Sequence, residues 1–261
     1  MFDHLAPARR RLVLVVVAAL VAGLLAAAVV VGVRVVVDVD PASQADQGPV
    51  LVVPGYGGST DSVQGLAAAL RADGREVAVV ELAGDGKGDL HEQAEVLDAA
   101  VDAALASTGE PSVDVVGYSA GGVIARLWVR DLGGDALARR VVTLGSPHHG
   151  TELAGVGSEV GCPEACLQLA PGSDLLRGLN AGDETPDGPV FVSVWTTDDE
   201  TVTPPESAEL AGALNLSVQS ICADAEVSHG DLPDDPVAQA LVESALASAL
   251  PSVPPCPAAG G

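Results

Sequence analysis

The chain has 261 residues and a formal net charge of −24 at pH 7, from 36 acidic residues against 12 lysines and arginines. A surface this acidic repels nucleic acid, so a nucleic-acid-binding function is excluded and no such partner is expected. Aromatic residues make up only 2% of the chain. A core must therefore consist mainly of Val, Leu and Ala, which is typical of layered α/β domains.

The N-terminal segment has the pattern of a membrane anchor. Three arginines, Arg9 to Arg11, precede the uncharged apolar run Leu12–Val33. As a helix, this run is long enough to cross a hydrocarbon core of roughly 30 Å, and it exceeds the usual signal-peptide core of about 7–15 residues. We therefore expect a cytoplasmic basic tail at 1–11, a transmembrane signal-anchor at 12–33 and an extracellular domain beyond it. The alternative is cleavage near Ala26, which would give a secreted protein.

Beyond a polar linker at 34–48, apolar runs alternate with helical patterns. This alternation predicts right-handed crossovers and an α/β fold with a mostly parallel sheet of about six strands flanked by helices. The predicted strands are Val50–Val53, Val77–Leu82, Val113–Val116, Val141–Leu144, Val190–Trp195 and Leu214–Ile221. The predicted helices run from Thr60 or Asp61 to Asp73, then over Leu90–Ser107, Val123–Leu132 and Pro236–Leu250. One domain is expected over residues 49–261, with an irregular, cap-like insertion at 151–188.

The string Gly117-Tyr118-Ser119-Ala120-Gly121 lies between a predicted strand and a predicted helix. The bare string is common by chance, but this context is that of a nucleophile elbow, where a sharp turn exposes a strained serine at the edge of the sheet. The two glycines leave room where a Cβ would collide with a neighbouring strand or helix. We therefore predict that Ser119 is a nucleophile.

A nucleophilic serine needs a base, and the base needs an orienting acid. Folds with this elbow carry the serine, the acid and the histidine in that chain order. His148 and His149 precede any acid that follows a later strand, so the order counts against them. His229 follows the last predicted strand in an irregular loop and is the predicted base, with an ordinary surface histidine as the alternative.

The acid is less well defined by the residues alone. Asp198, Asp199 and Glu200 directly follow the strand that ends at Trp195. Any of these carboxylates could reach the imidazole, and a run of three acids is often simply solvated.

A glycine-rich loop, Pro54-Gly55-Tyr56-Gly57-Gly58, follows the first predicted strand. It lacks the spacing of a dinucleotide-binding loop or a P-loop. Its position two crossovers before the elbow favours an oxyanion loop, in which the backbone N–H groups of Tyr56 and Ala120 donate to one oxygen. A plain turn is the alternative.

Four cysteines, Cys162, Cys166, Cys222 and Cys256, allow three disulfide pairings. An oxidising compartment favours disulfides, and we predict Cys162–Cys166 and Cys222–Cys256. The second would stabilise the fold by about 3–4 kcal/mol and would restrain the segment that carries His229. Metal binding is the alternative, but the spacing resembles no zinc site, so no metal is expected.

Three strings together resemble the class 2 triacylglycerol lipases of the α/β-hydrolase superfamily, small bacterial lipases that include Bacillus lipase A and exported actinobacterial lipases. The strings are the elbow with Gly122, Leu144-Gly145-Ser146-Pro147-His148-His149-Gly150-Thr151, and Asp199-Glu200-Thr201-Val202-Thr203-Pro204. The segment Cys162–Asn180 is also similar to the actinobacterial members. The resemblance covers roughly Gly48 to Leu250.

This resemblance implies an α/β-hydrolase fold and cofactor-free hydrolysis of carboxylic esters of lipids. It implies Asp199 as the acid, with Asp198 as the fallback, His229 as the base, and Tyr56 and Ala120 as oxyanion donors. The chain departs from the family at Pro54, where the family usually has His, and at Thr201, which is commonly aliphatic. A monomer is expected, with a lipid ester as its substrate.

Two other function classes remain open on the sequence. A cell-envelope acyltransferase would use the same triad but admit an alcohol in place of water, and a non-catalytic hydrolase-like domain would only bind. The leucines of the insertion could receive an acyl chain or touch a lipid surface, or they could simply pack the insertion onto the domain. These leucines are Leu167, Leu169, Leu175, Leu176 and Leu179.

Overall fold

The computed structural model describes residues 41–247 and Cys256. The predicted transmembrane segment at 12–33 and the predicted end of the last helix at Leu250 lie outside these residues. Among the described residues, no helix combines the length and the apolar character that crossing a bilayer requires.

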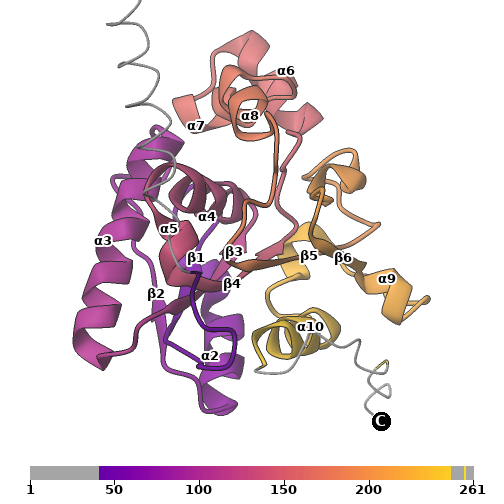
Figure 1. Cartoon of the computed structure of the whole chain (residues 1–261). Helices are drawn as coiled ribbons and strands as arrows, with labels where there is room; N and C mark the ends of the chain where they lie inside the picture. The colour runs from indigo at the N-terminus through magenta and orange to yellow at the C-terminus, as the bar shows by residue number, and fades with distance from the viewer. Residues whose placement is uncertain (1–40, 248–255, 257–261) are drawn as a thin grey trace, which may run out of the picture. The chain divides into compact units, whose positions relative to one another are not determined.

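A single sheet of six parallel strands forms the centre of the domain (Figure 1). The spatial order is β2-β1-β3-β4-β5-β6, so the prediction of a parallel sheet of about six strands is confirmed. The strands are β1 (Val50–Val53), β2 (Val77–Val79), β3 (Val113–Tyr118), β4 (Ala138–Leu144), β5 (Val190–Trp195) and β6 (Leu214–Ser217). Strands β1, β3 and β5 consist mostly of apolar residues without a strict alternation, because helices cover both faces of the sheet. Strand β4 differs, since the buried Arg139 and Arg140 lie near its start.

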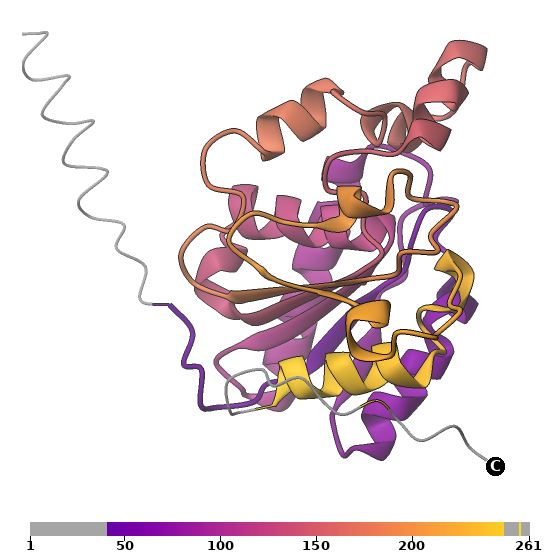
Figure 2. The same ribbon diagram turned by 90° about the vertical axis from the view of Figure 1, so that its right-hand side faces the viewer.

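Helices α3, α4 and α5 cover one face of the sheet, and helices α2 and α10 cover the other (Figures 1 and 2). Their bounds are α2 (Gln64–Ala72), α3 (Leu90–Thr108), α4 (Ala120–Asp131), α5 (Gly134–Leu137) and α10 (Pro236–Leu246). Strand β1 illustrates how the two faces are filled. Leu51 and Val53 belong to the core cluster beneath α3 and α4, whereas Val50 and Val52 belong to the cluster beneath α2 and α10, because successive side chains of a strand point to opposite faces.

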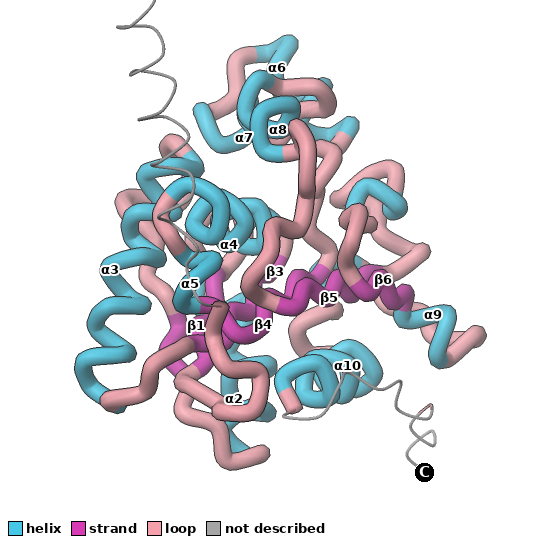
Figure 3. Tube along the Cα trace, in the orientation of Figure 1, coloured by secondary structure: helices cyan, strands magenta, loops and turns pink. Residues whose placement is uncertain are grey.

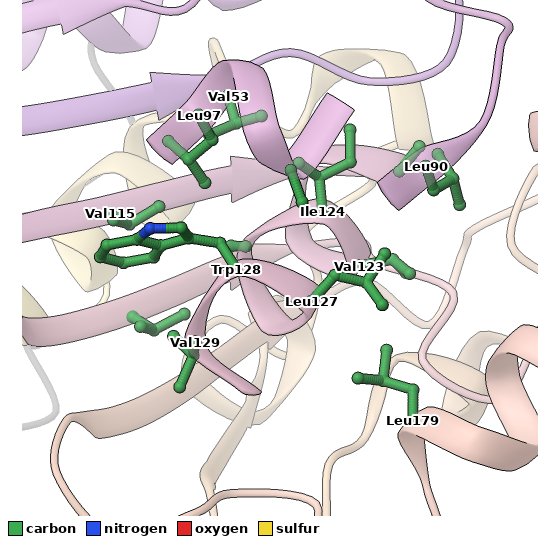
Figure 4. Packing of buried hydrophobic residues seen from close by; sticks show 14 of the residues in the cluster. Val53, Leu90, Leu97, Val115, Val123, Ile124, Leu127, Trp128, Val129 and Leu179 are labelled. Carbon is green, nitrogen blue, oxygen red and sulfur yellow. The ribbon is translucent and has the colours of Figure 1, made fainter. Parts of the chain in front are cut away.

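The core cluster around α4 fixes the helix that begins at the elbow (Figure 4). Trp128 is fully buried in it, and its indole Nε1 donates a hydrogen bond to Asp98 of α3 at 2.9 Å. Truncating a buried tryptophan typically costs about 3–5 kcal/mol. Helix α4, which begins at the elbow, is therefore anchored in the core of the domain.

The insertion between β4 and β5 forms three helices above the carboxyl edge of the sheet (Figure 3), which we call the cap. They are α6 (Glu152–Val160), α7 (Glu164–Gln168) and α8 (Asp174–Leu179). Leu176 and Leu179 are buried in the core cluster that contains α4, whereas Leu167 is 43% exposed. The leucines of the insertion therefore divide between packing the cap onto the domain and remaining at the surface.

Several predicted elements differ in extent from the structure. Strand β2 ends at Val79 rather than Leu82, and β4 begins at Ala138 rather than Val141. The prediction that a strand runs through Ile221 was wrong, because β6 ends at Ser217 and α9 (Val218–Ile221) follows. The Ser217 hydroxyl accepts a hydrogen bond from the N–H of Ser220, an N-cap that favours a helix at this point. The segment after Ser59 also begins as a 3-10 turn, η1 (Thr60–Val63), before α2. Two further 3-10 turns are η2 (Pro205–Ala208) and η3 (His229–Asp231).

Candidate active site

Ser119 occupies a strained turn between β3 and α4. Its backbone has φ 54° and ψ −124°, and it is the only non-glycine residue with positive φ in the described part of the chain. Such a conformation costs on the order of 1–3 kcal/mol and persists only where the surroundings enforce it. Here β3 and α4 are both buried on either side of it, so the strand-to-helix turn holds the hydroxyl at the sheet edge.

Glycine is required on both sides of this serine for steric reasons. A Cβ on Gly117 would lie 2.5 Å from the backbone of Gly122, and a Cβ on Gly121 would lie 2.3 Å from the carbonyl oxygen of Val53. Both obstacles are backbone atoms, which cannot move aside as a flexible side chain could. The turn is therefore restricted to glycine at these two positions, as the sequence pattern indicates.

The side chains of Ser119, His229 and Asp199 form one hydrogen-bonded series. His229 Nε2 lies 3.0 Å from Ser119 Oγ, and His229 Nδ1 lies 2.7 Å from Asp199 Oδ2. Because an ionised carboxylate can only accept, Nδ1 carries the proton and Nε2 presents a lone pair to the serine hydroxyl. The three residues follow β3, β5 and β6, and parallel strands bring these carboxyl ends to one edge of the sheet.

Of the three consecutive acids after β5, only Asp199 faces the imidazole. It is 5% exposed, and its Oδ1 accepts hydrogen bonds from the N–H groups of Thr201 at 2.9 Å and Val202 at 2.7 Å. Asp198 and Glu200 are exposed, and Asp198 Oδ2 instead accepts from Gln219 Nε2 at 3.2 Å. The turn geometry therefore distinguishes acids that the residues alone leave equivalent, and the one that faces the imidazole is the acid implied by the family resemblance.

His148 is remote from this series and belongs to a separate buried network. Its Nε2 lies 3.1 Å from Thr143 Oγ1, which donates to Ser193 Oγ, and Ser193 in turn donates to the carbonyl of Ala208. The chain of donors requires a proton on Nε2 of His148. Burial, reinforced by the positive charge of Arg126, holds the pKa of His148 well below its ordinary value, so this imidazole is neutral.

His149 also lies apart from the triad. It is an exposed residue whose Nε2 lies 3.1 Å from Glu184 Oε1. The two histidines of the Ser-Pro-His-His-Gly-Thr string are thus occupied elsewhere, and His229 alone faces the serine.

Tyr118 contacts His229 in a way that the sequence pattern does not reveal. Its hydroxyl donates to the carbonyl oxygen of His229 at 3.1 Å, and its ring centroid lies 5.2 Å from the imidazole centroid. Burial, together with the charges of Asp199 and Asp231, raises the pKa of Tyr118 to about 12. The hydroxyl therefore remains a donor at neutral pH. The sequence shows that Tyr118 directly precedes Ser119. It does not show that the tyrosine contacts the loop of His229.

The glycine-rich loop after β1 lies against the elbow. A Cβ on Gly55 would lie 3.0 Å from the Cβ of Ser119, so the loop passes directly beside the nucleophile. Tyr56 follows in this loop, and Ala120 is the first residue of α4, where a helix N–H has no acceptor within the helix. The two residues therefore flank Ser119 in the chain or in space, and their role as oxyanion donors stays a prediction.

A cavity of about 200 Å³ opens at Ser119 beneath the cap. Its lining is mostly apolar and combines the glycine-rich loop after β1, the cap and the turn that contains Asp199. The residues are Tyr56, Ser119, Pro147, Thr151, Leu153, Ala154, Cys166, Leu169, Thr201 and Val202. A substrate group that reaches the serine would therefore pack against aliphatic side chains.

Both predicted disulfides are present in the structure. Cys162–Cys166 joins the end of α6 to α7, and Cys222–Cys256 links the end of α9 to the C-terminal segment. Among residues 41–247 and Cys256, there is no group of three or more His, Cys, Asp or Glu side chains arranged to hold a metal ion.

Residues 48–158 match a family model described as alpha/beta hydrolase fold. The matched segment runs from the start of β1 through the elbow into α6. It therefore includes Ser119 but ends before Asp199 and His229.

Several solved structures are similar to this chain. Aspergillus fumigatus lipase B has a TM-score of 0.70 at 20% identity, over 81% of this chain and 55% of that one. The mature form of Bacillus licheniformis lipase BlEst2 has a TM-score of 0.56 at 19% identity, over 68% of this chain and 86% of that one. A Listeria innocua gene product has a TM-score of 0.57 at 16% identity, over 77% of this chain and 94% of that one. The chain spans little more than half the length of the Aspergillus lipase, and what it shares with these proteins is the α/β-hydrolase fold.

Proposed function

We propose that this protein is a serine hydrolase that cleaves carboxylic ester bonds of lipids through an acyl-enzyme on Ser119. The observation that carries the proposal is the hydrogen-bonded series from Ser119 to His229 to the buried Asp199, with separations of 3.0 Å and 2.7 Å. These distances meet the geometric requirement for a nucleophile, a general base and an orienting acid. The resemblance to class 2 triacylglycerol lipases supports the same chemistry.

The reaction follows from this geometry. His229 Nε2 takes the hydroxyl proton while Ser119 Oγ bonds to the acyl carbon and the carbonyl oxygen becomes an oxyanion. Collapse of this intermediate breaks the ester bond, and Nε2 returns the proton to the departing alcohol. Water then loses a proton to Nε2 and bonds to the acyl carbon. Collapse of this second intermediate breaks the bond between the acyl carbon and Ser119 Oγ, Nε2 returns the proton to Oγ, and the acid is released. Asp199 stabilises the imidazolium that forms at each stage.

The N–H groups of Tyr56 and Ala120 are proposed to hold the oxyanion. Donors fixed where negative charge develops lower the barrier by about 3–4 kcal/mol each. The close approach of Gly55 to the serine and the position of Ala120 at the start of α4 support this assignment.

The aliphatic cavity and its rim support a lipid acyl group as the substrate. Two large apolar side chains of the cavity lining are exposed, Tyr56 at 42% and Leu153 at 60%. Val156 of α6 and Leu167 of α7 are also exposed in the cap, at 65% and 43%. Exposed apolar groups gathered beside a cavity favour a ligand or surface that is itself apolar. The net charge of −24 favours neutral over anionic lipid.

Labelling with a fluorophosphonate and hydrolysis of p-nitrophenyl esters of graded chain length test this function. The folded protein should take up one equivalent of label and hydrolyse the esters, and Ser119→Ala should abolish both. Wild-type protein that takes up no label, beside a serine hydrolase that does, would refute the enzyme proposal. Labelling without ester hydrolysis would refute the ester substrate and leave the nucleophile in place. Addition of glycerol or a sugar as acceptor distinguishes hydrolysis from acyl transfer.

The same proposal places the domain outside the cytoplasm, held at the membrane by residues 12–33. Two disulfides support an oxidising compartment. External protease added to intact cells that express the full chain should remove the domain and leave a short membrane-bound fragment. A domain that stays protected until the cells are lysed would contradict this location.

A further inference from the structure

Thr151, which directly precedes the first helix of the cap, makes hydrogen bonds to the turn that contains Asp199. Thr151 is 7% exposed and precedes α6, where its Oγ1 accepts a hydrogen bond from the N–H of Leu153 at 3.4 Å. This one hydrogen bond is all that an N-cap residue needs to make. The same hydroxyl, however, also donates to the carbonyl oxygen of Thr201 at 2.6 Å and accepts from the N–H of Thr203 at 3.1 Å.

The Thr201 carbonyl belongs to the peptide group that donates to the acid. A single planar peptide joins this C=O to the N–H of Val202, and that N–H donates to Asp199 Oδ1 at 2.7 Å. The hydroxyl of Thr151 therefore reaches the carboxylate through one rigid group. Hydrogen bonds in series polarise one another, so donation to the C=O strengthens donation by the N–H.

A second contact fixes the same turn to the cap. The N–H of Glu152 donates to the carbonyl of Thr203 at 2.9 Å, and the N–H of Thr151 donates to the carbonyl of Leu169 at 3.0 Å. The acid turn is thus bonded to the start of α6, and α6 to the residue after α7. Thr151, Leu169 and Val202 also line the cavity at Ser119, so the acid and the cavity wall share one hydrogen-bonded segment.

We propose that Thr151 is a positioning residue, whose hydroxyl orients the peptide between Thr201 and Val202 and thereby holds Asp199 in line with His229. The inference rests on the proposed function of this triad. Without the hydroxyl, the peptide can rotate, and Asp199 Oδ1 loses the fixed orientation of the closer of its two backbone donors, the N–H of Val202. A small displacement of this kind, away from the reacting atoms, lowers turnover on the order of 10-fold to 100-fold.

Two substitutions at Thr151 separate the hydroxyl from the methyl group. Thr151→Val keeps the shape of the cavity wall and removes the hydroxyl, so kcat should fall by about 10-fold or more, with KM little changed. Thr151→Ser keeps the hydroxyl and should retain most of the wild-type kcat. A valine variant with wild-type kcat, or a serine variant as impaired as the valine variant, would overturn the proposal.

A spectroscopic readout makes the test independent of the substrate. The proton shared by His229 Nδ1 and Asp199 Oδ2 should give a downfield 1H resonance in the wild type and in Thr151→Ser, and a shifted or broadened one in Thr151→Val. An unchanged resonance in the valine variant would contradict the positioning role. If no ester is hydrolysed by the wild type, the proposed function fails while this resonance still tests Thr151.

Thr143→Val is the matched control, because Thr143 is also a buried threonine with two side-chain partners, His148 and Ser193. It should lose stability in urea but keep kcat and the downfield resonance. If Thr143→Val lost both kcat and the downfield resonance, removing any buried hydroxyl in this part of the fold would disturb the Asp199–His229 pair. The specific role of Thr151 would then be refuted.

Discussion

Two buried aspartates have different partners, one at the amino ends of the parallel strands and the other at their carboxyl ends. Asp114, near the start of β3, is fully buried, and its Oδ2 accepts hydrogen bonds from Arg75 Nη2 at 2.5 Å and Arg139 Nη2 at 2.6 Å. Asp199 is bonded instead to two neutral backbone N–H groups and to the imidazole of His229. One carboxylate is paired with permanent cations, and the other with a group that gains and loses a proton.

The arginines beside Asp114 also hold the two ends of the described domain. Arg139 Nη2 donates to the carbonyl of Leu246 at 2.6 Å, and Arg75 Nη2 donates to the carbonyl of Gly48 at 3.0 Å. The segment that enters the sheet and the helix that closes it are therefore fixed to one ion cluster. The comparison indicates that Asp114 serves stability, whereas Asp199 is free to stabilise a charge that appears only during a reaction.

The largest expected effect is on turnover at the catalytic edge. Asp199→Asn should lower kcat on the order of 10⁴-fold, because an amide cannot hold the reactive tautomer of His229 or stabilise its cation. Steady-state rates on a p-nitrophenyl ester measure the effect. Asp198→Asn is the matched control and should keep wild-type activity. An inactive Asp198 variant beside an active Asp199 variant would reverse the assignment of the acid.

At the other edge, the expected effect is on stability. Asp114→Asn leaves two buried guanidinium groups without their counter-charge, so the free energy of unfolding should fall by about 3–5 kcal/mol. Urea denaturation followed by tryptophan fluorescence measures this change. The rate per labelled active site should stay at the wild-type value.

A surface pair provides the control for this measurement. Asp174 pairs with Arg177 in an exposed position, and Asp174→Asn should leave the urea midpoint unchanged, since exposed ion pairs contribute little. Equal effects of the two substitutions would show that Asp114 has no special role in holding the domain.

The loop closed by the Cys222–Cys256 disulfide includes a residue from each of the two aspartate regions. His229 belongs to the site around Ser119, and the carbonyl of Leu246 belongs to the ion cluster around Asp114. Replacing both cysteines by serine should lower the free energy of unfolding by about 3–4 kcal/mol, mainly by releasing the unfolded chain. The Cys162–Cys166 disulfide closes a much shorter loop. Replacing these two cysteines by serine should therefore lower the free energy of unfolding by only about 2 kcal/mol. Urea midpoints of the two double variants measure the difference, and a larger loss for the cap disulfide would contradict the loop-length argument.

The smallest expected effect concerns Tyr118. Tyr118→Phe removes one hydrogen bond to the His229 loop, worth about 0.5–1.5 kcal/mol, and should lower kcat only severalfold. The pKa of about 12 in the folded protein lies above the ordinary value near 10. The unfolded chain therefore releases this proton first, and the tyrosine's contribution to stability is complete below about pH 10 and is lost as the pH rises towards 12.

Urea midpoints between pH 9 and pH 11 test this sign. The wild type should lose stability more steeply with rising pH than Tyr118→Phe does. Parallel curves for the two proteins would mean that the tyrosine has the same affinity for its proton in both states.

The sequence by itself determined the parallel sheet and the elbow, because both depend on residues that are close together in the chain. Apolar runs separated by helical patterns specify strands with right-handed crossovers. The elbow needs only a strand, a helix and small residues beside Ser119. Gly117 and Gly121 meet backbone atoms that leave no room for a Cβ, so the pattern and the structure share one steric cause.

The residues alone left the acid open and the family resemblance only implied Asp199; the tertiary structure decided which acid faces His229 and what supports it. Asp198, Asp199 and Glu200 are chemically alike and adjacent, and the selection depends on how a turn closes against segments far away in the chain. Ser119 and His229 are 110 residues apart, and Thr151 meets the acid turn across about 50 residues. Contacts of this kind depend on the packing of whole elements against each other, and no local pattern of residues encodes that.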